Sequence, residues 1–487
     1  MFESLSSFFA TPWVYYTFWA IYAVTVVTII GVILSENRNP VKSLAWMVVL
    51  FMLPVVGIIL YIFFGRSIKN QRMISRGNRR RLKRRDRVRS ADVKALDLSD
   101  ASRQQITLVR TLADSPLHVG NTVEVFTSGA EKFEALKRDL REARSYINME
   151  YYIFEDDSVG REICEILVER ARAGVEVRLI YDHVGSFSVS SRFFKEMRRA
   201  GIQAYPFFKV SFPLLGTRIN WRNHRKLVII DGRTAYLGGM NIARRYVDGG
   251  KKFAGWRDTH LRLSGPILSS LSFSFAVDWN FMGQPLLDDE VVGESVTTDS
   301  RGAVNDVGIQ LLTSGPMSQW SNIAYTFHKA VTNARKRIFI QTPYFLPTEG
   351  LFKALQVAAL AHVDVRLMLP ETSDSRMLTY ASASYVDEAL KAGIKIYFYQ
   401  AGMLHSKMII VDDEFSSVGS TNFDFRSFEY NFEANVMMYS VELNHKLAEI
   451  FKNDLTKSCR VSQPEWRRRP YTRKAVESIV RLLSPIL

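Results

Sequence analysis

Two histidines, each followed two residues later by a lysine, are the residues in this sequence best suited to chemistry. The first pair is His224 and Lys226, in residues 223–231 (NHRKLVIID), and the second pair lies in residues 404–413 (LHSKMIIVDD). The apolar run after each pair is typical of a strand, in which alternate residues share a face, so the imidazole and the ammonium project the same way. An imidazole beside an ammonium suits chemistry on an anionic phosphate.

The pattern that each pair opens occurs twice in the chain, which is not expected by chance. Displacement at phosphorus needs a nucleophile on one side and a proton donor for the leaving oxygen on the other, and two copies supply both from one residue type. We therefore predict that one histidine forms a phosphohistidine while the other serves as acid and then as base. The lysines, the asparagines and the small residues between them are predicted to bind the phosphate oxygens. The repeated residues, at identical spacings, are His224, Lys226, Asp231, Gly239 and Asn241, and then His405, Lys407, Asp412, Ser420 and Asn422.

A histidine nucleophile must be neutral and correctly oriented, which calls for a carboxylate on its other ring nitrogen. Candidate carboxylates lie downstream of each copy. Asp258 in residues 255–258 (GWRD) parallels Glu433 in residues 431–433 (NFE).

The paired HxKxxxxD motifs resemble those of the phospholipase D superfamily. The resemblance implies that the two downstream carboxylates orient the two histidines and that no metal cofactor is required. Symmetry alone does not decide which histidine attacks phosphorus, but the superfamily pattern implies His224 as the nucleophile and His405 as the acid and base. Asp231 and Asp412 belong to the catalytic motif by name, although we interpret them as structural.

The composition indicates a polyanionic partner and a reducing compartment. The 487-residue chain has a formal net charge of +15 and a pI near 9.6, so nucleic acid or an anionic membrane surface attracts it. Two cysteines are too few for a disulfide framework, and no Cys/His cluster has zinc spacing, so we expect no metal and no other cofactor. The remaining histidines lack a lysine two residues on and are predicted to be structural or exposed: His118, His183, His260, His328, His362 and His445.

Two apolar stretches near the N-terminus, at about residues 13–34 and 44–64, are each close to the ~20 residues needed to cross a bilayer. A signal peptide is disfavoured because the first stretch lacks a basic n-region, and buried core helices are disfavoured because neither stretch contains a charge. Residues 66–89 then carry twelve Lys and Arg against one acid. The positive-inside rule therefore places both termini and the catalytic domains in the cytoplasm, with the basic block close to anionic headgroups.

From residue 121 onward, strands alternate with amphipathic helices, which implies sheets covered by helices. This order recurs in the second half, where residues 364–367 (DVRL) match residues 176–179 (EVRL). With the superfamily resemblance, it predicts an α/β fold: two phospholipase D-like sandwich domains with mixed sheets, related by pseudo-twofold symmetry and preceded by a two-helix transmembrane hairpin. Expected strands include residues 145–154, 309–312 and 337–345. The expected boundaries are 1–65 for the hairpin, 66–120 for a basic juxtamembrane segment and linker, 121–285 for the first domain, 286–306 for a linker, 307–461 for the second domain and 462–487 for a basic amphipathic tail.

Two segments have alternative interpretations. Residues 207–215 (FFKVSFPLL) are either a loop that dips into the bilayer to admit acyl chains or a buried hydrophobic loop. The tail, with RRR at 467–469 and an amphipathic pattern at 475–483, either attaches to the membrane surface or packs against the catalytic body.

Within the superfamily, the chain is most similar to bacterial cardiolipin synthases, and the resemblance covers almost its whole length. It rests on the paired N-terminal stretches and on short segments such as residues 222–226 (RNHRK), 256–260 (WRDTH) and 342–347 (TPYFLP). It implies a phosphatidyltransferase of the bacterial inner membrane. One phosphatidylglycerol gives its phosphatidyl group to histidine and releases glycerol, and a hydroxyl of a second phosphatidylglycerol attacks to give cardiolipin. The implied partners are these two lipids and an anionic membrane surface, without nucleic acid.

The motifs alone leave a rival reaction, in which a membrane-bound phospholipase D-type phosphodiesterase hydrolyses phospholipids with water as the acceptor. A membrane scaffold without activity is disfavoured because both motifs are intact. The sequence leaves open the second lipid (phosphatidylglycerol or phosphatidylethanolamine), the acyl-chain preference and the oligomeric state.

Overall fold

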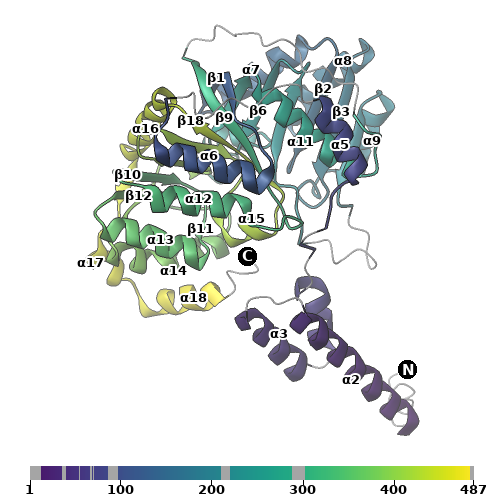
Figure 1. Cartoon of the computed structure of the whole chain (residues 1–487), viewed down its shortest axis with the longest axis vertical. Coiled ribbons are helices and arrows are strands. Elements are labelled where there is room, and N and C mark those ends of the chain that lie inside the picture. Colours follow the sequence, from purple (N-terminus) through teal and green to yellow (C-terminus); the bar gives the residue numbers. More distant parts are fainter. Residues whose placement is uncertain are drawn as a thin grey trace. The chain divides into compact units, whose positions relative to one another are not determined.

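The computed structural model describes residues 12–35, 40–53, 55–65, 68–69, 71–85, 97–209, 220–287 and 302–482 (Figure 1). The chain forms two compact units, an N-terminal unit of residues 1–68 with 210–220 and a catalytic unit of residues 69–209 with 221–487. Some of the sequence predictions fall outside the described residues: most of the 286–306 linker, positions 210–215 of the hydrophobic loop, and the last five residues of the tail.

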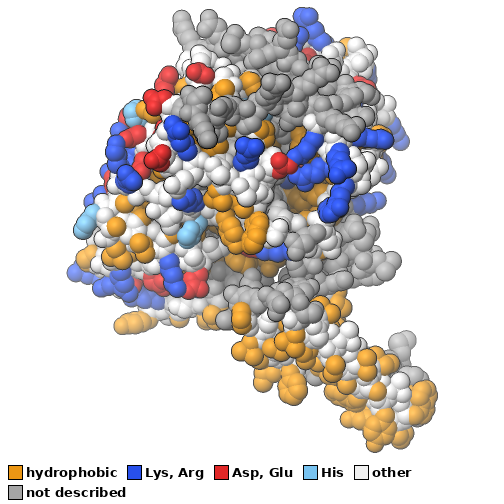
Figure 2. Space-filling view, in the orientation of Figure 1, with side chains coloured by type: hydrophobic (Ala, Val, Ile, Leu, Met, Phe, Trp, Pro, Cys, Tyr) orange, Lys and Arg blue, Asp and Glu red, His pale blue; other side chains and the backbone are white. Residues whose placement is uncertain are grey.

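Within its described residues, the N-terminal unit contains one continuous helix long and apolar enough to cross a bilayer, α2 (Pro12–Ser35). The second apolar stretch is divided into α3 (Pro40–Met52), α4 (Val56–Leu60) and a short π-helix, η1 (Tyr61–Gly65). Apolar side chains cover α2 and α3 in Figure 2. The first helix of the expected hairpin is confirmed, whereas the second stretch is not one continuous helix.

The break in the second stretch lies at Val55, whose φ is 65°. The rings of Trp46 and Tyr61 lie 5.4 Å apart, although about 22 Å would separate residues fifteen positions apart in a continuous helix. The chain therefore turns back on itself after α3. The Tyr22 hydroxyl donates a hydrogen bond to Leu50 O (2.7 Å), which ties α2 to α3.

The catalytic unit is built from two halves in which the main strands and helices follow the same order. The first half contains β1 (His118–Phe126), α7 (Gly129–Arg141), β2 (Tyr146–Tyr151), α8 (Ser158–Arg172), β3 (Glu176–Asp182), α9 (Ser191–Arg199), β4 (Gln203–Phe207), β5 (Lys226–Ile230), β6 (Thr234–Gly238), α10 (Arg245–Asp248), β7 (Trp256–Arg257), β8 (His260–Ser264) and α11 (Ile267–Phe281).

The second half begins with a strand longer than expected, because β9 also pairs with β1. The second half contains β9 (Val304–Ser314), α12 (Asn322–Asn333), β10 (Arg337–Gln341), β11 (Phe345–Leu346), α13 (Glu349–Leu360), β12 (Asp364–Pro370), α14 (Arg376–Lys391), β13 (Lys395–Tyr399), β14 (Met403–Leu404), β15 (Met408–Val411), β16 (Phe415–Gly419), β17 (Phe423–Asp424), α15 (Phe425–Glu429), β18 (Glu433–Tyr439), α16 (Val441–Leu455) and β19 (Ser458–Arg460). Helices α5 (Arg76–Arg85) and α6 (Asp100–Ala113) precede the first half, and α17 (Gln463–Arg467) and α18 (Tyr471–Leu482) follow the second.

One sheet runs through both halves. Outward from the centre its order is β1-β8-β6-β5-β2-β3-β4 in the first half and β9-β18-β16-β15-β10-β12-β13 in the second, with β19 at the outer edge. Apart from β19, each strand of the sheet in one half thus has an equivalent in the other, and the halves meet at the antiparallel pair β1–β9. The pairs β2–β3–β4 and β10–β12–β13 are parallel, and the remaining neighbours in each half are antiparallel. The predicted mixed sheets with pseudo-twofold symmetry are confirmed.

Helices cover both faces of the sheet. On one face, α7, α8 and α9 cover the first half, and α12, α13 and α14 cover the second. On the other face, α11 and α16 pack on a core that both halves share, including Leu227 of β5 and Ile410 of β15. Helix α6 adds Ile106 and Val109 to the core of the second half, so part of the segment expected to be a linker belongs to the catalytic unit.

The tail packs against the catalytic unit through one face of α18. Val480 contacts the apolar cluster that includes Ala381 of α14, and Arg481 forms an ion pair with Glu388 (2.6 Å). The opposite face of α18 leaves Tyr471, Ile479 and Leu482 exposed by 87%, 62% and 80%. Packing against the body is therefore confirmed for one face, and the other face is available for a surface contact.

The motif aspartates Asp231 and Asp412 lie in the turns after β5 and β15, at the ends of these strands away from the lysines. Both have a positive φ (52° and 51°). The Asp231 carboxylate accepts hydrogen bonds from the backbone N–H groups of residues 144–146 (2.8–2.9 Å), and Asp412 does the same for residues 335–337 (2.7–3.1 Å). Each aspartate thus joins its turn to the start of the neighbouring strand, β2 or β10.

Asp231→Asn and Asp412→Asn are each expected to lower the free energy of unfolding by about 1–3 kcal/mol, because charge-assisted hydrogen bonds to three backbone groups are weakened. Asparagine tolerates a positive φ, so added backbone strain does not contribute. Thermal melting of the detergent-solubilised protein measures the loss. Asp413→Asn is the matched control, since its ion pair with Lys336 lies at the surface and contributes little. Loss of activity without loss of stability would instead give Asp231 or Asp412 a part in the chemistry.

Candidate active site

Backbone hydrogen bonds between the two halves hold each motif histidine beside a strand of the other half. His224 N donates to Phe432 O (2.9 Å), and Phe432 N donates to Arg222 O (2.8 Å). The second histidine repeats the arrangement: β14 pairs with β7 in parallel, and His405 N donates to Arg257 O (2.7 Å). Each histidine is therefore anchored at the residue that precedes a candidate orienting carboxylate.

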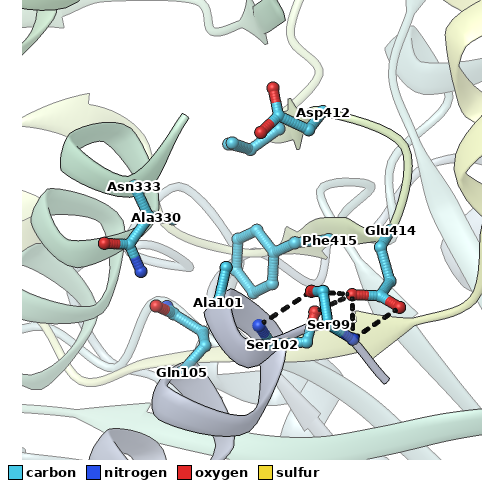
Figure 3. A pocket seen from close by; sticks show the side chains of 10 residues that line it. Ser99, Ala101, Ser102, Gln105, Ala330, Asn333, Asp412, Glu414 and Phe415 are labelled. Atoms are coloured by element: carbon cyan, nitrogen blue, oxygen red, sulfur yellow. Dashed lines mark hydrogen bonds between the residues drawn. The ribbon is translucent and has the colours of Figure 1, made fainter. Parts of the chain in front are cut away.

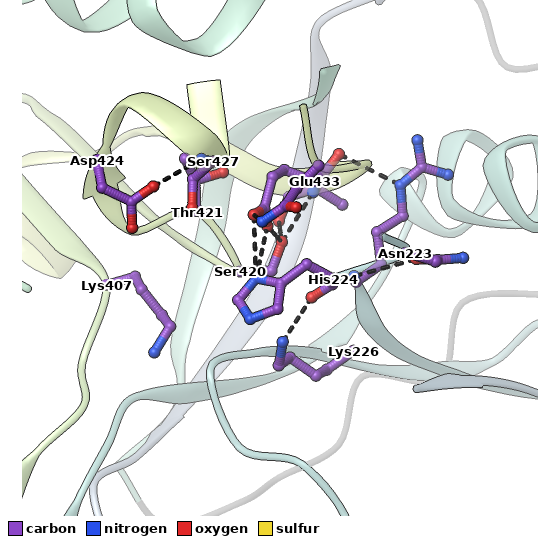
Figure 4. Close-up of polar contacts among 12 residues, drawn as sticks. Asn223, His224, Lys226, Lys407, Ser420, Thr421, Asp424, Ser427 and Glu433 are labelled. Atoms are coloured by element: carbon purple, nitrogen blue, oxygen red, sulfur yellow. Dashed lines mark hydrogen bonds and ion pairs between the residues drawn. The ribbon is translucent and has the colours of Figure 1, made fainter. Parts of the chain in front are cut away.

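The carboxylates consequently pair crosswise with the histidines. His224 Nδ1 lies 3.0 Å from Glu433 Oε1, and His405 Nδ1 lies 2.6 Å from Asp258 Oδ2. Both carboxylates are fully buried. Figure 4 shows Glu433 above the His224 ring. Because a carboxylate on Nδ1 fixes the tautomer and the ring orientation, the Nε2 atom of each histidine is left for the reaction.

The small residues of the repeat lie against these carboxylates. The Ser420 hydroxyl donates to Glu433 Oε2. Gly239 makes room for the aspartate, because a Cβ at this position would lie 2.0 Å from Asp258 Oδ1. The structure thus gives Gly239 and Ser420 contacts with the orienting carboxylates, and their predicted contact with phosphate stays a prediction.

The two motif lysines are buried and close to the histidines. Lys226 Nζ donates to His224 O (2.5 Å), and Lys407 Nζ lies 2.7 Å from His405 Nδ1 and 3.1 Å from its Nε2. Burial is the main cause that lowers the pKa of Lys407 to about 8 and that of Lys226 to about 7, and repulsion from the Lys407 ammonium contributes to the shift of Lys226. Two cations without solvent create a site that favours an anion.

Both histidines are held in the neutral form. Burial lowers the pKa of His224 to about 4, against the opposing effect of Glu433. Burial also lowers the pKa of His405, and Lys407 adds to this effect. A neutral imidazole with an oriented Nε2 is competent as a nucleophile.

The motif asparagines are already partly hydrogen-bonded. Asn241 Oδ1 accepts from Ile153 N (3.1 Å), and its Nδ2 donates to the Tyr246 hydroxyl (2.5 Å). The Asn422 amide makes a side-chain hydrogen bond with Asp424, while its Oδ1 has no partner among the described residues. Each amide nitrogen carries two hydrogens, so one N–H of each asparagine is left for a phosphate oxygen.

Aromatic rings that the sequence did not single out flank the two histidines. The Tyr152 ring lies 5.0 Å from the His224 ring, and the Trp256 ring lies 5.3 Å from the His405 ring. These residues occupy positions that are not equivalent in the two halves, so the repeat gave no signal for them. The sequence-level signals are their positions, one residue after β2 and at the start of β7, and for Trp256 also its place in the segment 256–260 that carries the family resemblance.

Two histidines outside the motifs have internal hydrogen bonds. His118 Nε2 lies 2.7 Å from Ser270 Oγ, and His260 Nδ1 accepts from Met240 N (3.3 Å).

A small pocket of about 60 Å³ lies beside Asp412, between α6 and β16. In this pocket, Ser99 and Ser102 donate hydrogen bonds to Glu414 (Figure 3). The pocket is therefore a gap between packed elements, and it lies away from the two motif histidines.

The fold and the paired motifs define a phospholipase D-like enzyme. Residues 136–251 and 327–455 match the family described as cardiolipin synthase, PLD-like domain, and residues 21–66 match a phospholipase D-nuclease N-terminal family. A crystal structure of phosphatidylserine synthase from Haemophilus influenzae superposes with a TM-score of 0.60 at 14% identity, covering 79% of this chain and all of that one, which supports the fold.

The chain belongs to the cardiolipin synthase family. It is 41% identical to cardiolipin synthase 2 of Bacillus cereus over 94% of this chain and 89% of that protein. It is 37% identical to the major cardiolipin synthase of Bacillus subtilis over 94% of this chain and 96% of that protein. The protein is accordingly a phosphatidyltransferase with cardiolipin synthase function.

The pKa values at the site predict a bell-shaped pH dependence. Activity needs neutral His224, so kcat/KM is expected to fall as the pH drops through about 4 and not at the usual histidine value near 6.5. It is expected to fall again as the pH rises, first as His405, the predicted acid, loses its proton below the usual histidine pKa of 6.5, and further above about 7 to 8, where Lys226 and Lys407 lose their charge in the free enzyme. Measuring kcat/KM on phosphatidylglycerol vesicles against pH tests both limbs.

Glu433→Gln should move the acid limb to still lower pH, because Glu433 raises the pKa of His224. It should also reduce kcat by about 10²–10⁴-fold, since the ring loses its orienting carboxylate. Asp258→Asn is the control: it alters the other histidine and should leave the acid limb in place. An acid limb that moves upward in Glu433→Gln would contradict the pairing.

Proposed function

We propose that this cardiolipin synthase transfers a phosphatidyl group from one phosphatidylglycerol to another through a phosphohistidine at His224. The observation that carries the proposal is the crosswise pairing, in which the Nδ1 of each histidine contacts a buried carboxylate, so that Nε2 is the nitrogen that can react with phosphorus or with a proton. The wider assignment of roles also follows the superfamily pattern.

In the first step, His224 Nε2 attacks phosphorus and the P–N bond forms. The bond from phosphorus to the glycerol oxygen breaks, and the oxygen takes a proton from His405 Nε2. His224 becomes a phosphorylated imidazolium whose charge Glu433 stabilises. His405 must be protonated for this step, and the negative charge of the bound phosphodiester favours that form.

In the second step, a hydroxyl of the second phosphatidylglycerol attacks phosphorus and His405 Nε2 accepts its proton. The P–O bond forms, the P–N bond breaks, and neutral His224 is restored with cardiolipin as the product. Lys226, Lys407 and one N–H each of Asn241 and Asn422 stabilise the charge on the non-bridging oxygens. The proposal needs no metal, so activity should persist in excess chelator.

The rival reaction uses water in the second step and gives phosphatidic acid. Phosphatidylglycerol vesicles with the purified full-length protein distinguish the two reactions. Cardiolipin with equimolar glycerol supports the transferase, whereas phosphatidic acid as the main product supports hydrolysis. Vesicles that also contain phosphatidylethanolamine test whether this lipid serves as the second substrate.

The different roles proposed for the two histidines predict different outcomes for the variants His224→Ala and His405→Ala. His224→Ala should form no covalent intermediate. His405→Ala should slow both steps by about 10²–10⁴-fold, because it removes general acid and base help. With a donor that has a good leaving group, His405→Ala should still become labelled and should accumulate the intermediate.

The measurement is an acid-labile, alkali-stable phosphohistidine mapped by peptide in each variant. Label on His405 in His224→Ala would reverse the assignment. Absence of label from wild type and from both variants would argue for direct displacement.

The proposal for localisation is a bacterial inner membrane, crossed twice, with the catalytic unit in the cytoplasm. The twelve Lys and Arg of residues 66–89 support the cytoplasmic side for everything after the second apolar stretch. The turn at Val55 favours one alternative, in which α3 and α4 dip into the bilayer and return to the same side, so that the chain crosses only once.

Single-cysteine labelling of intact cells separates the two paths. Cys164 and Cys459 are replaced first, because Cys459 is exposed. If the chain crosses twice, Pro40→Cys is labelled from outside and Arg80→Cys is not. Protection of both positions would support the single crossing, and labelling at position 80 would overturn the cytoplasmic location.

Helix α18 supports contact of the catalytic unit with an anionic surface. Residues 467–474 carry five Lys and Arg and no acid, next to the exposed Tyr471, Ile479 and Leu482. In the same cysteine-free background, an environment-sensitive fluorophore at Ile479→Cys should report an apolar environment on vesicles with phosphatidylglycerol and not on phosphatidylcholine alone. Val441→Cys, 49% exposed at the start of α16, is the matched control.

A further inference from the structure

The surroundings of His405 include an exposed carboxylate, Asp374. In the antiparallel pair β10–β15, Gln341 lies opposite Met408, so the chain after β10 continues beside His405 at the same edge of the sheet. There the buried Tyr344 donates its hydroxyl to Asp374 Oδ1 (2.5 Å). Asp374 lies in the segment after β12, the parallel neighbour of β10.

The other half of the catalytic unit holds this segment in place. Lys252, in the segment before β7, donates its Nζ to Ser373 O (3.0 Å) and to Asp374 O (2.9 Å). The same segment leads to Trp256, whose ring lies 5.3 Å from that of His405. The Trp256 indole N–H is buried and has no hydrogen-bond partner among the described residues. The His405 side of the site therefore contains both an acceptor and a donor that are available to a ligand.

The Asp374 carboxylate has acceptor capacity left. Oδ1 accepts from Tyr344, and Oδ2 has no hydrogen-bond donor among the described residues. Its charge reaches the reacting groups, because Asp374 opposes the lowering of the pKa of both His405 and Lys407. A carboxylate repels a phosphodiester but accepts hydrogen bonds from hydroxyl groups.

On the His224 side, the position equivalent to Asp374 carries no carboxylate. The match of residues 176–179 with residues 364–367 makes Ser186 the equivalent of Asp374. The Ser186 hydroxyl is used internally: it donates to Tyr152 O (3.3 Å) and accepts from Phe154 N (3.2 Å). The charge of Asp374 thus acts on His405, whereas the equivalent position on the His224 side holds a neutral serine.

We propose that Asp374, held by Tyr344, binds the free hydroxyls of the glycerol headgroup of the acceptor lipid next to His405. The inference rests on the proposed function, since it assigns the acceptor to the histidine that takes the proton. Two neighbouring hydroxyls can donate to one carboxylate, and one of them is then close to His405 as its base. A water molecule is bound less strongly by this arrangement than the glycerol headgroup is. Asp374 therefore favours transfer to the second lipid over hydrolysis.

The test uses the reverse reaction of the full-length protein, with cardiolipin as the donor and a soluble alcohol as the acceptor. Glycerol carries neighbouring hydroxyls and 1-propanol carries one. Asp374→Ala is expected to raise the KM for glycerol by about tenfold or more, as for the loss of a charge-assisted hydrogen bond, and to leave that for 1-propanol nearly unchanged. On phosphatidylglycerol vesicles, the ratio of cardiolipin to phosphatidic acid should fall.

Glu371→Ala is the matched control, because Glu371 is an exposed carboxylate of the same segment. Tyr344→Phe should give a smaller rise in the KM for glycerol, since Asp374 stays but loses its fixed position. With a donor whose leaving group carries no free hydroxyl, formation of the phosphohistidine should be unchanged in Asp374→Ala. Equal effects on glycerol and 1-propanol, or no effect on either, would overturn the inference. A wild-type protein that makes no cardiolipin would instead refute the proposed function.

Discussion

The active site depends on one constraint, the exchange of backbone hydrogen bonds between the two halves. His224 is anchored at Phe432 and His405 at Arg257, and in each case the next residue of the other half is the carboxylate that holds Nδ1. Neither half contains a complete histidine–carboxylate pair. The continuous sheet through β1 and β9 and the shared core under α11 and α16 keep the two halves in the register that these pairs need.

The site concentrates charge that would be unfavourable without its partners. Lys226, Lys407, Asp258 and Glu433 are all buried, and burial of an unpaired charge is strongly unfavourable. The carboxylates are held ionised by the neighbouring lysines and histidines, so that the pKa of Asp258 and that of Glu433 lie below their ordinary values. An anion that enters the site raises the pKa of both lysines and so favours their charged form. The structure therefore keeps the groups that bind phosphate in place before substrate binds.

Much of this was predictable because the sequence contains the arrangement twice. The repeat identified the histidines, the lysines, the carboxylates and the α/β fold with two equivalent halves. It did not identify which carboxylate serves which histidine, because Asp258 and Glu433 have equivalent positions and only the pairing between the halves decides. It missed Tyr152, Trp256 and Asp374, because these residue types are not repeated in the other half. The break at Val55 was missed because hydropathy reports the composition of a stretch and not its path.

The difference between Gly239 and Ser420 has a consequence for how such a protein can change over time. In a symmetric dimer of identical chains, every substitution occurs at both equivalent positions at once. A serine at position 239 would crowd Asp258, while a glycine at position 420 would remove a hydrogen bond from Glu433. Two halves in one chain escape this coupling, because each position can mutate alone. A duplicated gene that encodes both halves in tandem can therefore give two formerly equivalent histidines different catalytic roles.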